Sequence, residues 1–137
     1  MADFITIERT ISAPITRVFD AFITPEDLTQ WHHAGDGWQT PYAEVDAVVG
    51  GKQKIVYANS DGEVQFEIES EFTIVDKPNK LAYAFDGRTA SVVFEAVDEK
   101  TNIQMQIDIE DENDKELQLK GWSEHIDNLE IYIGGTT

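Results

Sequence analysis

The sequence contains no cysteine, which excludes disulfides, thiolate metal ligands and cysteine nucleophiles. Basic residues are scarce as well, because 10 lysines and arginines stand against 27 acidic residues, for a formal net charge of -17. Such a surface repels phosphate backbones, so we expect no nucleic-acid partner. A solvated acidic surface explains most of this charge. A weak cation site or a basic protein partner are the alternatives, chiefly for the acids clustered between Asp108 and Glu116.

Long apolar runs are also missing, and no segment is long enough to cross a bilayer. The N-terminal residues Met1 to Ile5 lack the basic and apolar parts of a signal peptide. We therefore expect no membrane insertion and a cytoplasmic location. Glycine-rich phosphate loops, nucleotide fingerprints and a G-x-S-x-G elbow are absent, so no cofactor is predicted. With no linker or repeat, residues 1–137 are expected to form a single domain.

The segment from Leu117 to Ile133 has the clearest pattern in the chain. Its apolar residues recur every three or four positions, which predicts a long helix with one apolar face. Because this helix follows a run of strands, we expect it to lie across the concave side of a curved sheet and to leave an apolar hollow between them. The residues of that face are Leu119, Trp122, Ile126, Leu129 and Ile133.

The N-terminal part of the chain predicts one strand followed by two short helices. Phe4–Thr10 alternates, with isoleucines directed inward at 5, 7 and 11. A first helix is expected over Pro14–Phe22, with Ser12 as a good N-cap residue. Thr24 followed by Pro25 predicts the start of a second helix, with Leu28 and Trp31 on its apolar side.

The middle of the chain alternates between apolar and polar residues with a period of two, which is typical of half-buried strands. The expected strands are Tyr42–Val49, Lys52–Ala58, Val64–Ile74, Leu81–Phe85, Ser91–Val97 and Ile103–Ile109, with a tight turn at Gly50-Gly51. In the third of these the inward residues are Val64, Phe66, Ile68, Phe72 and Ile74. The order of strand, two helices, about six meandering strands and a long helix is an α+β arrangement.

Several local segments stand out in this order of elements: residues 7–14, 18–22, 24–28 with Trp31, 49–52, 71–81 and Gly121-Trp122 with Leu129. Together with the order of elements, they resemble the AHSA-like family, named for the activator of the Hsp-90 chaperone ATPase, in the START/Bet v 1-like (SRPBCC) superfamily. The resemblance implies a helix-grip fold of six to seven antiparallel strands around the C-terminal helix, often with a cavity. It also implies binding of lipids, sterols, polyketides or other apolar molecules, or a chaperone partner. His32 and His33 depart from the aromatic character common after Trp31, so no binding specificity is transferred.

The three histidines, His32, His33 and His125, are the only possible nitrogen ligands for a metal. The first two could coordinate a metal with an acid such as Asp36, but a mononuclear site needs three or four ligands, and we predict none. Both are expected at the surface or at a pocket rim. His125 lies one turn from Trp122 on the helix, where a packing histidine and a single polar anchor for a ligand are both open.

Two polar residues on apolar strands need an explanation. Ser70 interrupts an apolar series, which favours a bulge or a bend over a ligand contact. Glu95 is expected to point outward, with Val92, Phe94 and Ala96 inward, and a buried acid with a raised pKa is the alternative.

The leading hypothesis is a binding module that holds a small apolar or amphipathic molecule between the sheet and the C-terminal helix. The residues expected to line the cavity, or simply to fill it, are Trp31, Trp38, Phe66, Ile68, Ser70, Phe72, Tyr83, Phe85, Met105, Trp122, His125, Ile126 and Leu129. A protein-interaction domain that modulates a chaperone ATPase is the alternative. An enzyme acting in the same cavity comes third, without any catalytic residue to name. The chain is expected to be a monomer or a homodimer.

Overall fold

The computed structural model describes residues 4–33, 37–59, 61–62, 65–85, 87–109 and 114–134. The elements in chain order are β1 (Phe4–Ile11), α1 (Ile15–Ala21), α2 (Pro25–Trp31), β2 (Trp38–Val45), β3 (Lys52–Asn59), β4 (Gln65–Asp76), β5 (Lys80–Phe85), β6 (Arg88–Val97), β7 (Lys100–Asp108) and α3 (Lys115–Gly134). Strands β2, β6 and β7 therefore begin earlier than predicted, at Trp38, Arg88 and Lys100, and β2 ends at Val45 rather than Val49. The inward position predicted for Val64 lies outside the described residues.

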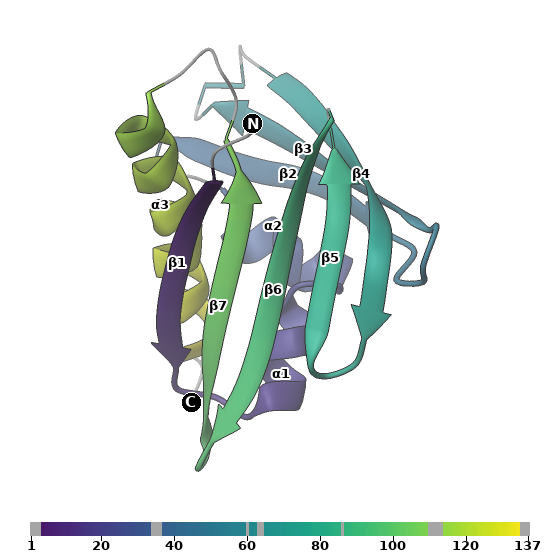
Figure 1. Cartoon of the computed structure of the whole chain (residues 1–137). Helices are drawn as coiled ribbons and strands as arrows, with labels where there is room; N and C mark the ends of the chain where they lie inside the picture. Colours follow the sequence, from purple (N-terminus) through teal and green to yellow (C-terminus); the bar gives the residue numbers. More distant parts are fainter. Residues whose placement is uncertain are drawn as a thin grey trace.

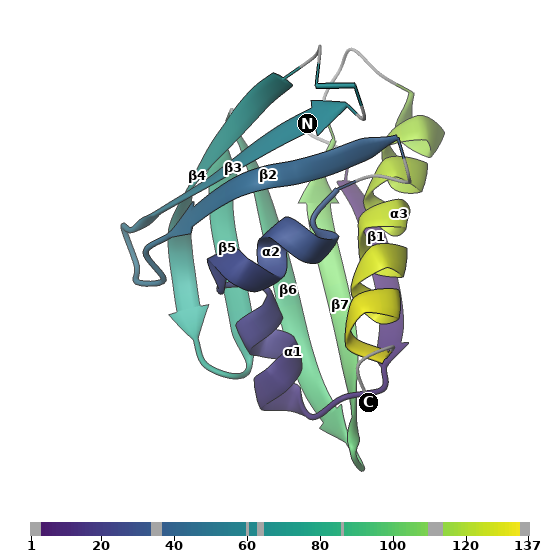
Figure 2. The same cartoon turned by 180° about the vertical axis from the view of Figure 1, so that it is seen from behind.

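Within the described residues, seven strands form one antiparallel sheet in the order β1-β7-β6-β5-β4-β3-β2 (Figure 1). Strands β2 to β7 follow one another as a meander, and β1 pairs with β7 from Phe4 opposite Asp108 to Ile11 opposite Thr101. The sheet is strongly curved, and α1, α2 and α3 all lie on its concave side (Figure 2). The sequence pattern predicted the long helix on the concave side, and the resemblance to the AHSA-like family implied this helix-grip architecture.

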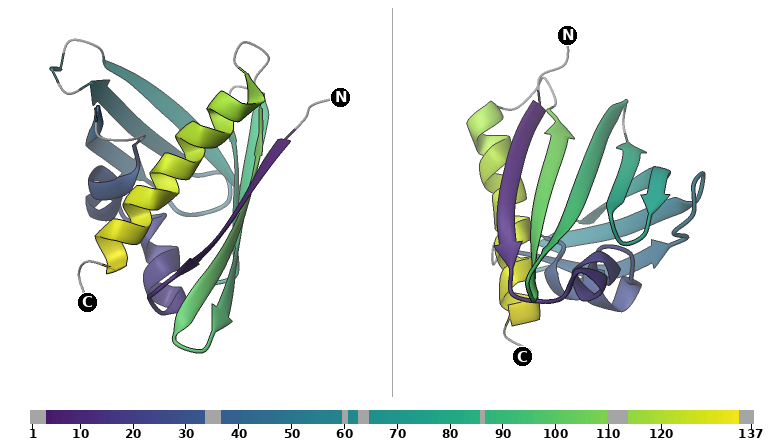
Figure 3. Two further views of the ribbon diagram at one scale, coloured as in Figure 1. Left: turned by 90° about the vertical axis from the view of Figure 1, so that its left-hand side faces the viewer. Right: turned by 60° about the horizontal axis from the view of Figure 1, so that its bottom comes forward.

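The α3 helix runs obliquely across the concave side, from the open upper edge of the sheet to the end where α1 lies (Figure 3). Its C-terminal half carries Ile126, Leu129 and Ile133, which are buried as predicted. The first turns of α3 lie at the open edge and have less of the sheet to pack against. The inward position expected for Leu119 was therefore wrong, since 37% of this residue is exposed.

The main core lies between the sheet and the three helices, because the strands alternate as predicted. Inward residues of β1 and β7 are buried, including Ile7 and Ile103, and so are Leu28 and Trp31 of α2. The Trp31 indole N–H donates a hydrogen bond of 2.9 Å to the Ala21 carbonyl, which satisfies its polar atom inside the core. The short helices α1 and α2 thus close one end of the curved sheet (Figure 2).

The helix starts agree in part with the sequence signals. Thr24 occupies the N-cap of α2, and Pro25 is its first residue, as predicted. The N-cap of α1 is Pro14, so the expectation of Ser12 at that position was wrong. The extended backbone of Pro14 and its fixed φ lead directly into the first turn of α1.

Two inward positions predicted from alternation are exposed for local reasons. A register shift between Phe72 and Ile74 interrupts the β4–β5 pairing, so the alternation changes phase and 38% of Ile74 is exposed. Ala96 is exposed because it lies one pair from the end of the β6–β7 hairpin, where Val97 faces Lys100. Glu95 is exposed, as expected.

The tight turn predicted at Gly50-Gly51 joins β2 to β3. Gly50 has a φ of +85°, which side chains rarely adopt. Gly51 lies so close to the Asp46 carbonyl that a Cβ atom would collide with backbone. Phe72 of β4 exchanges two backbone hydrogen bonds with this turn and so fixes it against the sheet.

Candidate functional site

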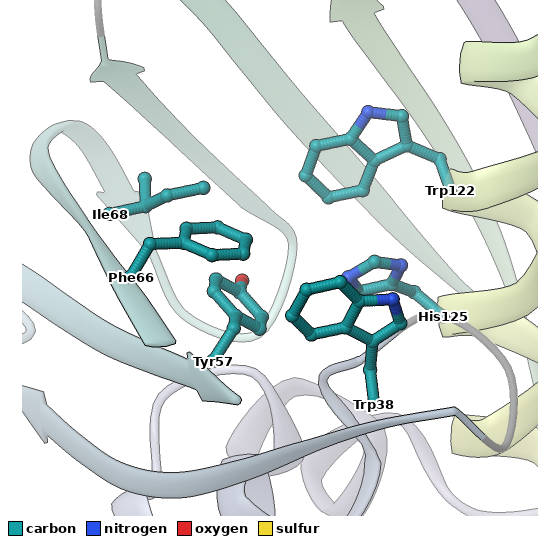
Figure 4. A pocket seen from close by; sticks show the side chains of 6 residues that line it. All are labelled: Trp38, Tyr57, Phe66, Ile68, Trp122 and His125. Atoms are coloured by element: carbon teal, nitrogen blue, oxygen red, sulfur yellow. The ribbon is translucent and has the colours of Figure 1, made fainter. Parts of the chain in front are cut away.

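A hollow of about 210 Å³ lies between the sheet and α3. One wall comes from β2, β3 and β4, and the other comes from one face of α3 (Figure 4). We call it the aromatic hollow, and its lining residues are Trp38, Tyr57, Phe66, Ile68, Trp122 and His125.

The rings of the sheet wall support one another. Phe66 meets Trp38 edge to face, with 5.6 Å between ring centroids, and lies 5.2 Å from Tyr57. On the helix wall, the rings of Trp122 and His125 are 4.9 Å apart. Phe66 remains 46% exposed although it faces the concave side, because the hollow opens to solvent beside it. The walls are therefore formed by packed side chains that leave room between them.

Two smaller features adjoin the aromatic hollow. A second hollow, of about 220 Å³, lies on the other side of Trp122 and His125 and is also lined by Arg88, Gln118 and Gly121. A space of about 20 Å³, enough for roughly one water molecule, lies deeper toward the core. Its lining residues are His32, Gln53, Ile55, Tyr57, Ile68, Ser70, Tyr83, Phe85 and Trp122.

Two histidines bring polar atoms into this aromatic environment. His32 follows α2, and its Nδ1 atom lies 2.8 Å from the Tyr57 hydroxyl of β3. His125 Nδ1 lies 2.8 Å from the Gly121 carbonyl, one turn earlier in α3. The two imidazole rings are 4.9 Å apart. Polar groups from three separate elements therefore meet at the inner end of the aromatic hollow.

Burial sets the protonation of these groups. Burial lowers the pKa of His125 to about 4, although the hydrogen bond to Gly121 raises it in part. Burial, with repulsion from His125, lowers the pKa of His32 well below its usual value. Burial also raises the pKa of the Tyr57 hydroxyl. Both imidazoles are therefore neutral at pH 7, and the tyrosine keeps its proton.

The residues expected around the cavity fall into three groups. Trp38, Phe66, Ile68, Trp122 and His125 line the aromatic hollow. Ser70, Tyr83 and Phe85 line the small inner space. The others are buried in the hydrophobic core and line neither space: Trp31, Phe72, Met105, Ile126 and Leu129.

Several residues of the site were missed at the sequence level. Tyr57 was not selected, although Gln53, Ile55 and Tyr57 alternate along β3 and are all buried. His32 was expected at the surface or a pocket rim and is instead 7% exposed inside the site. Its pairing with Tyr57 carries no local signal in the sequence.

The remaining polar candidates are also placed. Ser70 was expected to mark a bulge or a bend. The bulge is not at Ser70, which pairs in regular register with Gln53, and the irregularity falls three residues later. No cluster of three metal-ligating side chains occurs among the residues that the structure describes, whereas Asp36 and residues 110–113 of the acidic run lie outside them.

None of the described helices has the length and apolarity needed to cross a bilayer.

Residues 12–134 match the model of a protein family described as activator of Hsp90 ATPase homolog 1-like protein. The chain belongs to this family. The AHSA1-like assignment agrees with the curved sheet and long terminal helix, which are those of the SRPBCC/Bet v 1-like fold. No curated protein matches the sequence.

Solved structures support the same assignment. An AHSA1-like protein from Aeromonas hydrophila is 31% identical, with a TM-score of 0.92 over 98% of this chain and 94% of that chain. A protein from Cytophaga hutchinsonii is 29% identical, with a TM-score of 0.81 over 96% of this chain and 92% of the other. A protein from Nitrosomonas europaea is 18% identical, with a TM-score of 0.86 over 98% and 96% of the two chains, and shows the shared fold alone.

Proposed function

We propose that this AHSA1-like chain binds a small apolar or amphipathic molecule in the aromatic hollow. The observation that carries the proposal is the hollow itself: about 210 Å³ of space between the sheet and α3, walled by aromatic side chains from both and by Ile68 of the sheet. For comparison, an engineered apolar cavity of about 150 Å³ takes up benzene. The space therefore suits a molecule of one or two rings, for which removal of apolar surface from water supplies the affinity.

A thermal-shift screen with one- and two-ring aromatic compounds, sterols and fatty acids tests this proposal. A compound present at 100 times its Kd stabilises the folded chain by about 2.7 kcal/mol, which raises Tm by several degrees. Native mass spectrometry of the same mixtures reports the stoichiometry, for which we expect one molecule per chain. If no compound of any class stabilises the chain or is retained, the proposal is wrong.

A matched pair of variants on β4 ties binding to the hollow. Ile68→Trp introduces an indole into the space and is expected to abolish the thermal shift, whereas Ile74→Trp makes the same change at an exposed position outside it. Phe66→Ala, at a half-exposed site, removes part of the wall without overpacking and is expected to weaken binding. Equal shifts in all three variants would place the ligand elsewhere.

A second candidate function follows from the family description, which names a chaperone ATPase activator. An Hsp90 ATPase assay from the same host, with and without the chain, tests this role. The net charge of -17 predicts that such a contact uses a basic surface of the partner and weakens as salt is raised. Unchanged ATPase activity at low salt and high chain concentration would exclude it.

The feature that would support a reaction in the hollow is a buried acid hydrogen-bonded to a histidine. Among the described residues that line the three spaces, His32 is paired with a tyrosine, and no carboxylate is present. We therefore propose binding and no reaction.

A further inference from the structure

His125 presents a defined hydrogen-bonding group to the aromatic hollow. Its Nδ1 atom lies 2.8 Å from the carbonyl oxygen of Gly121. A carbonyl oxygen only accepts hydrogen bonds, so Nδ1 must carry the proton and donate it. In a neutral imidazole, the other nitrogen, Nε2, then has a lone pair and acts only as an acceptor.

The orientation of the ring directs this acceptor into the hollow. His125 extends from α3 with Nδ1 on the helix side and Nε2 toward the space between Trp38, Tyr57 and Phe66 (Figure 4). No hydrogen bond from the described residues reaches Nε2, whereas the nearby Tyr57 hydroxyl is engaged by His32.

Among the residues that the structure describes, the lining of the hollow carries no charge to pair with an ionised ligand. All six lining side chains are neutral, with His125 kept so by burial, which lowers its pKa to about 4. The cation of the adjoining hollow, Arg88, lies beyond Trp122 and His125, and its guanidinium carbon stacks 4.7 Å above the Phe85 ring. An anion in the aromatic hollow would therefore face a lone pair and lose its hydration.

We infer that the aromatic hollow selects an uncharged one- or two-ring molecule that donates a hydrogen bond, from a hydroxyl or an N–H group, to Nε2 of His125. This inference rests on the proposed binding function and names the ligand chemistry of the same site. A ligand without a donor leaves Nε2 unpaired in an apolar environment, and such a loss corresponds to roughly 10- to 100-fold in Kd. A carboxylate of the same size is disfavoured more strongly.

Three probes of equal ring size separate these contributions: 2-naphthol, naphthalene and 2-naphthoate. Kd values are measured at pH 7 by titration followed by ¹H–¹⁵N NMR. For the wild-type chain, we expect 2-naphthol to bind at least tenfold more tightly than naphthalene, and 2-naphthoate to bind most weakly. Because the rings are the same, the differences report the polar group.

The His125→Phe variant keeps a ring at this position and removes the acceptor, so naphthol and naphthalene should bind it equally. Ile131→Ala is the control, because this side chain of α3 is 72% exposed and lines neither hollow, so the naphthol preference should persist. Imidazole ¹⁵N shifts of the wild-type chain give an independent readout, in which His125 should carry its proton on Nδ1.

The outcomes distinguish this inference from the proposed function. Equal binding of naphthol and naphthalene, tighter binding of naphthoate, or a proton on Nε2 would overturn the inference and leave the binding function standing. Failure of all three probes together with the wider screen would overturn the binding function itself.

Discussion

Acid should destabilise this chain through His125, and the size of the effect follows from its burial. The unfolded chain takes up this proton near the usual pKa of 6.5, whereas the folded chain takes it up near a pKa of about 4. Between these two values, the unfolded state binds more protons than the folded state. Stability contributed by neutral His125 is therefore present above pH 6.5 and is lost as the pH falls toward 4.

The expected loss is about 2.5 kcal/mol between pH 7 and pH 4.5 for one group with these two pKa values. This is a large part of the stability of a typical domain, about 5–15 kcal/mol. Other groups also titrate in this range, including His32, whose pKa is lowered by burial and by His125. Relief of repulsion among the 27 acidic residues acts in the opposite direction.

A comparison with His125→Phe isolates the contribution of this one side chain. Free energies of unfolding are measured by urea denaturation of both proteins at several pH values from 7 to 4.5. The phenyl ring can retain the contacts with Trp122 and His32, which lie 4.9 Å away between centroids, but it cannot take up a proton. The wild-type chain should lose about 2.5 kcal/mol more than the variant over this range. Parallel curves for the two proteins would show that His125 titrates normally and is not enclosed as described.

Three further predictions concern the α3 helix. Tyr132→Phe removes a 2.6 Å hydrogen bond to the Asp27 carboxylate, which Arg17 also binds. Urea denaturation should then give a free energy of unfolding that is lower by about 1–2 kcal/mol. An unchanged value would mean that water replaces the lost hydrogen bond. Gly121→Ala adds a methyl group where no atom from elsewhere in the chain lies within 4 Å. Because alanine favours a helix over glycine, the free energy of unfolding should rise by about 0.5–1 kcal/mol. A lower Tm would show that the added methyl group collides with a neighbour. Leu129→Ala, at a fully buried site, should lower the free energy of unfolding by about 2–5 kcal/mol. Ile131→Ala, at a site that is 72% exposed, should change it by less than about 0.5 kcal/mol. Similar values for the two variants would contradict the orientation of α3.

Most of the fold could be predicted because each strand and helix buries one face in the same core, which fixes the spacing of its apolar residues. Strands with a single buried face must alternate, and a helix on a concave sheet must repeat every three or four residues. The inward isoleucines of β1 and the buried Ile126 and Leu129 of α3 follow directly from these periods. Turn residues such as Gly50 separated the elements correctly.

The errors occur where tertiary structure changes a local pattern. The bulge between Phe72 and Ile74 shifts the alternation of β4 and has no distinct sequence signal, since Ser70 looked like the better candidate. Leu119 continues the helical period, yet the first turns of α3 lie where the sheet no longer covers them. Periodicity shows which face is apolar but not how far the covering surface extends.

The candidate site was predictable only in part, for a related reason. The sequence selected Trp38, Phe66, Trp122 and His125, and the structure brings these side chains together in one hollow. The contact between Tyr57 and His32 joins residues 25 positions apart and depends on how β3 meets the end of α2. No spacing rule anticipates such a contact. The role of the hollow in binding stays a prediction.

The most direct test of the central claim is a set of intermolecular NOEs between bound 2-naphthol and the isotope-labelled chain. Binding in the aromatic hollow predicts contacts from the naphthol rings to the Ile68 methyl groups on the sheet wall and to the Trp38 and Trp122 indoles. Contacts confined to the outer face of the sheet, or to the exposed side chain of Ile131 on α3, would contradict it.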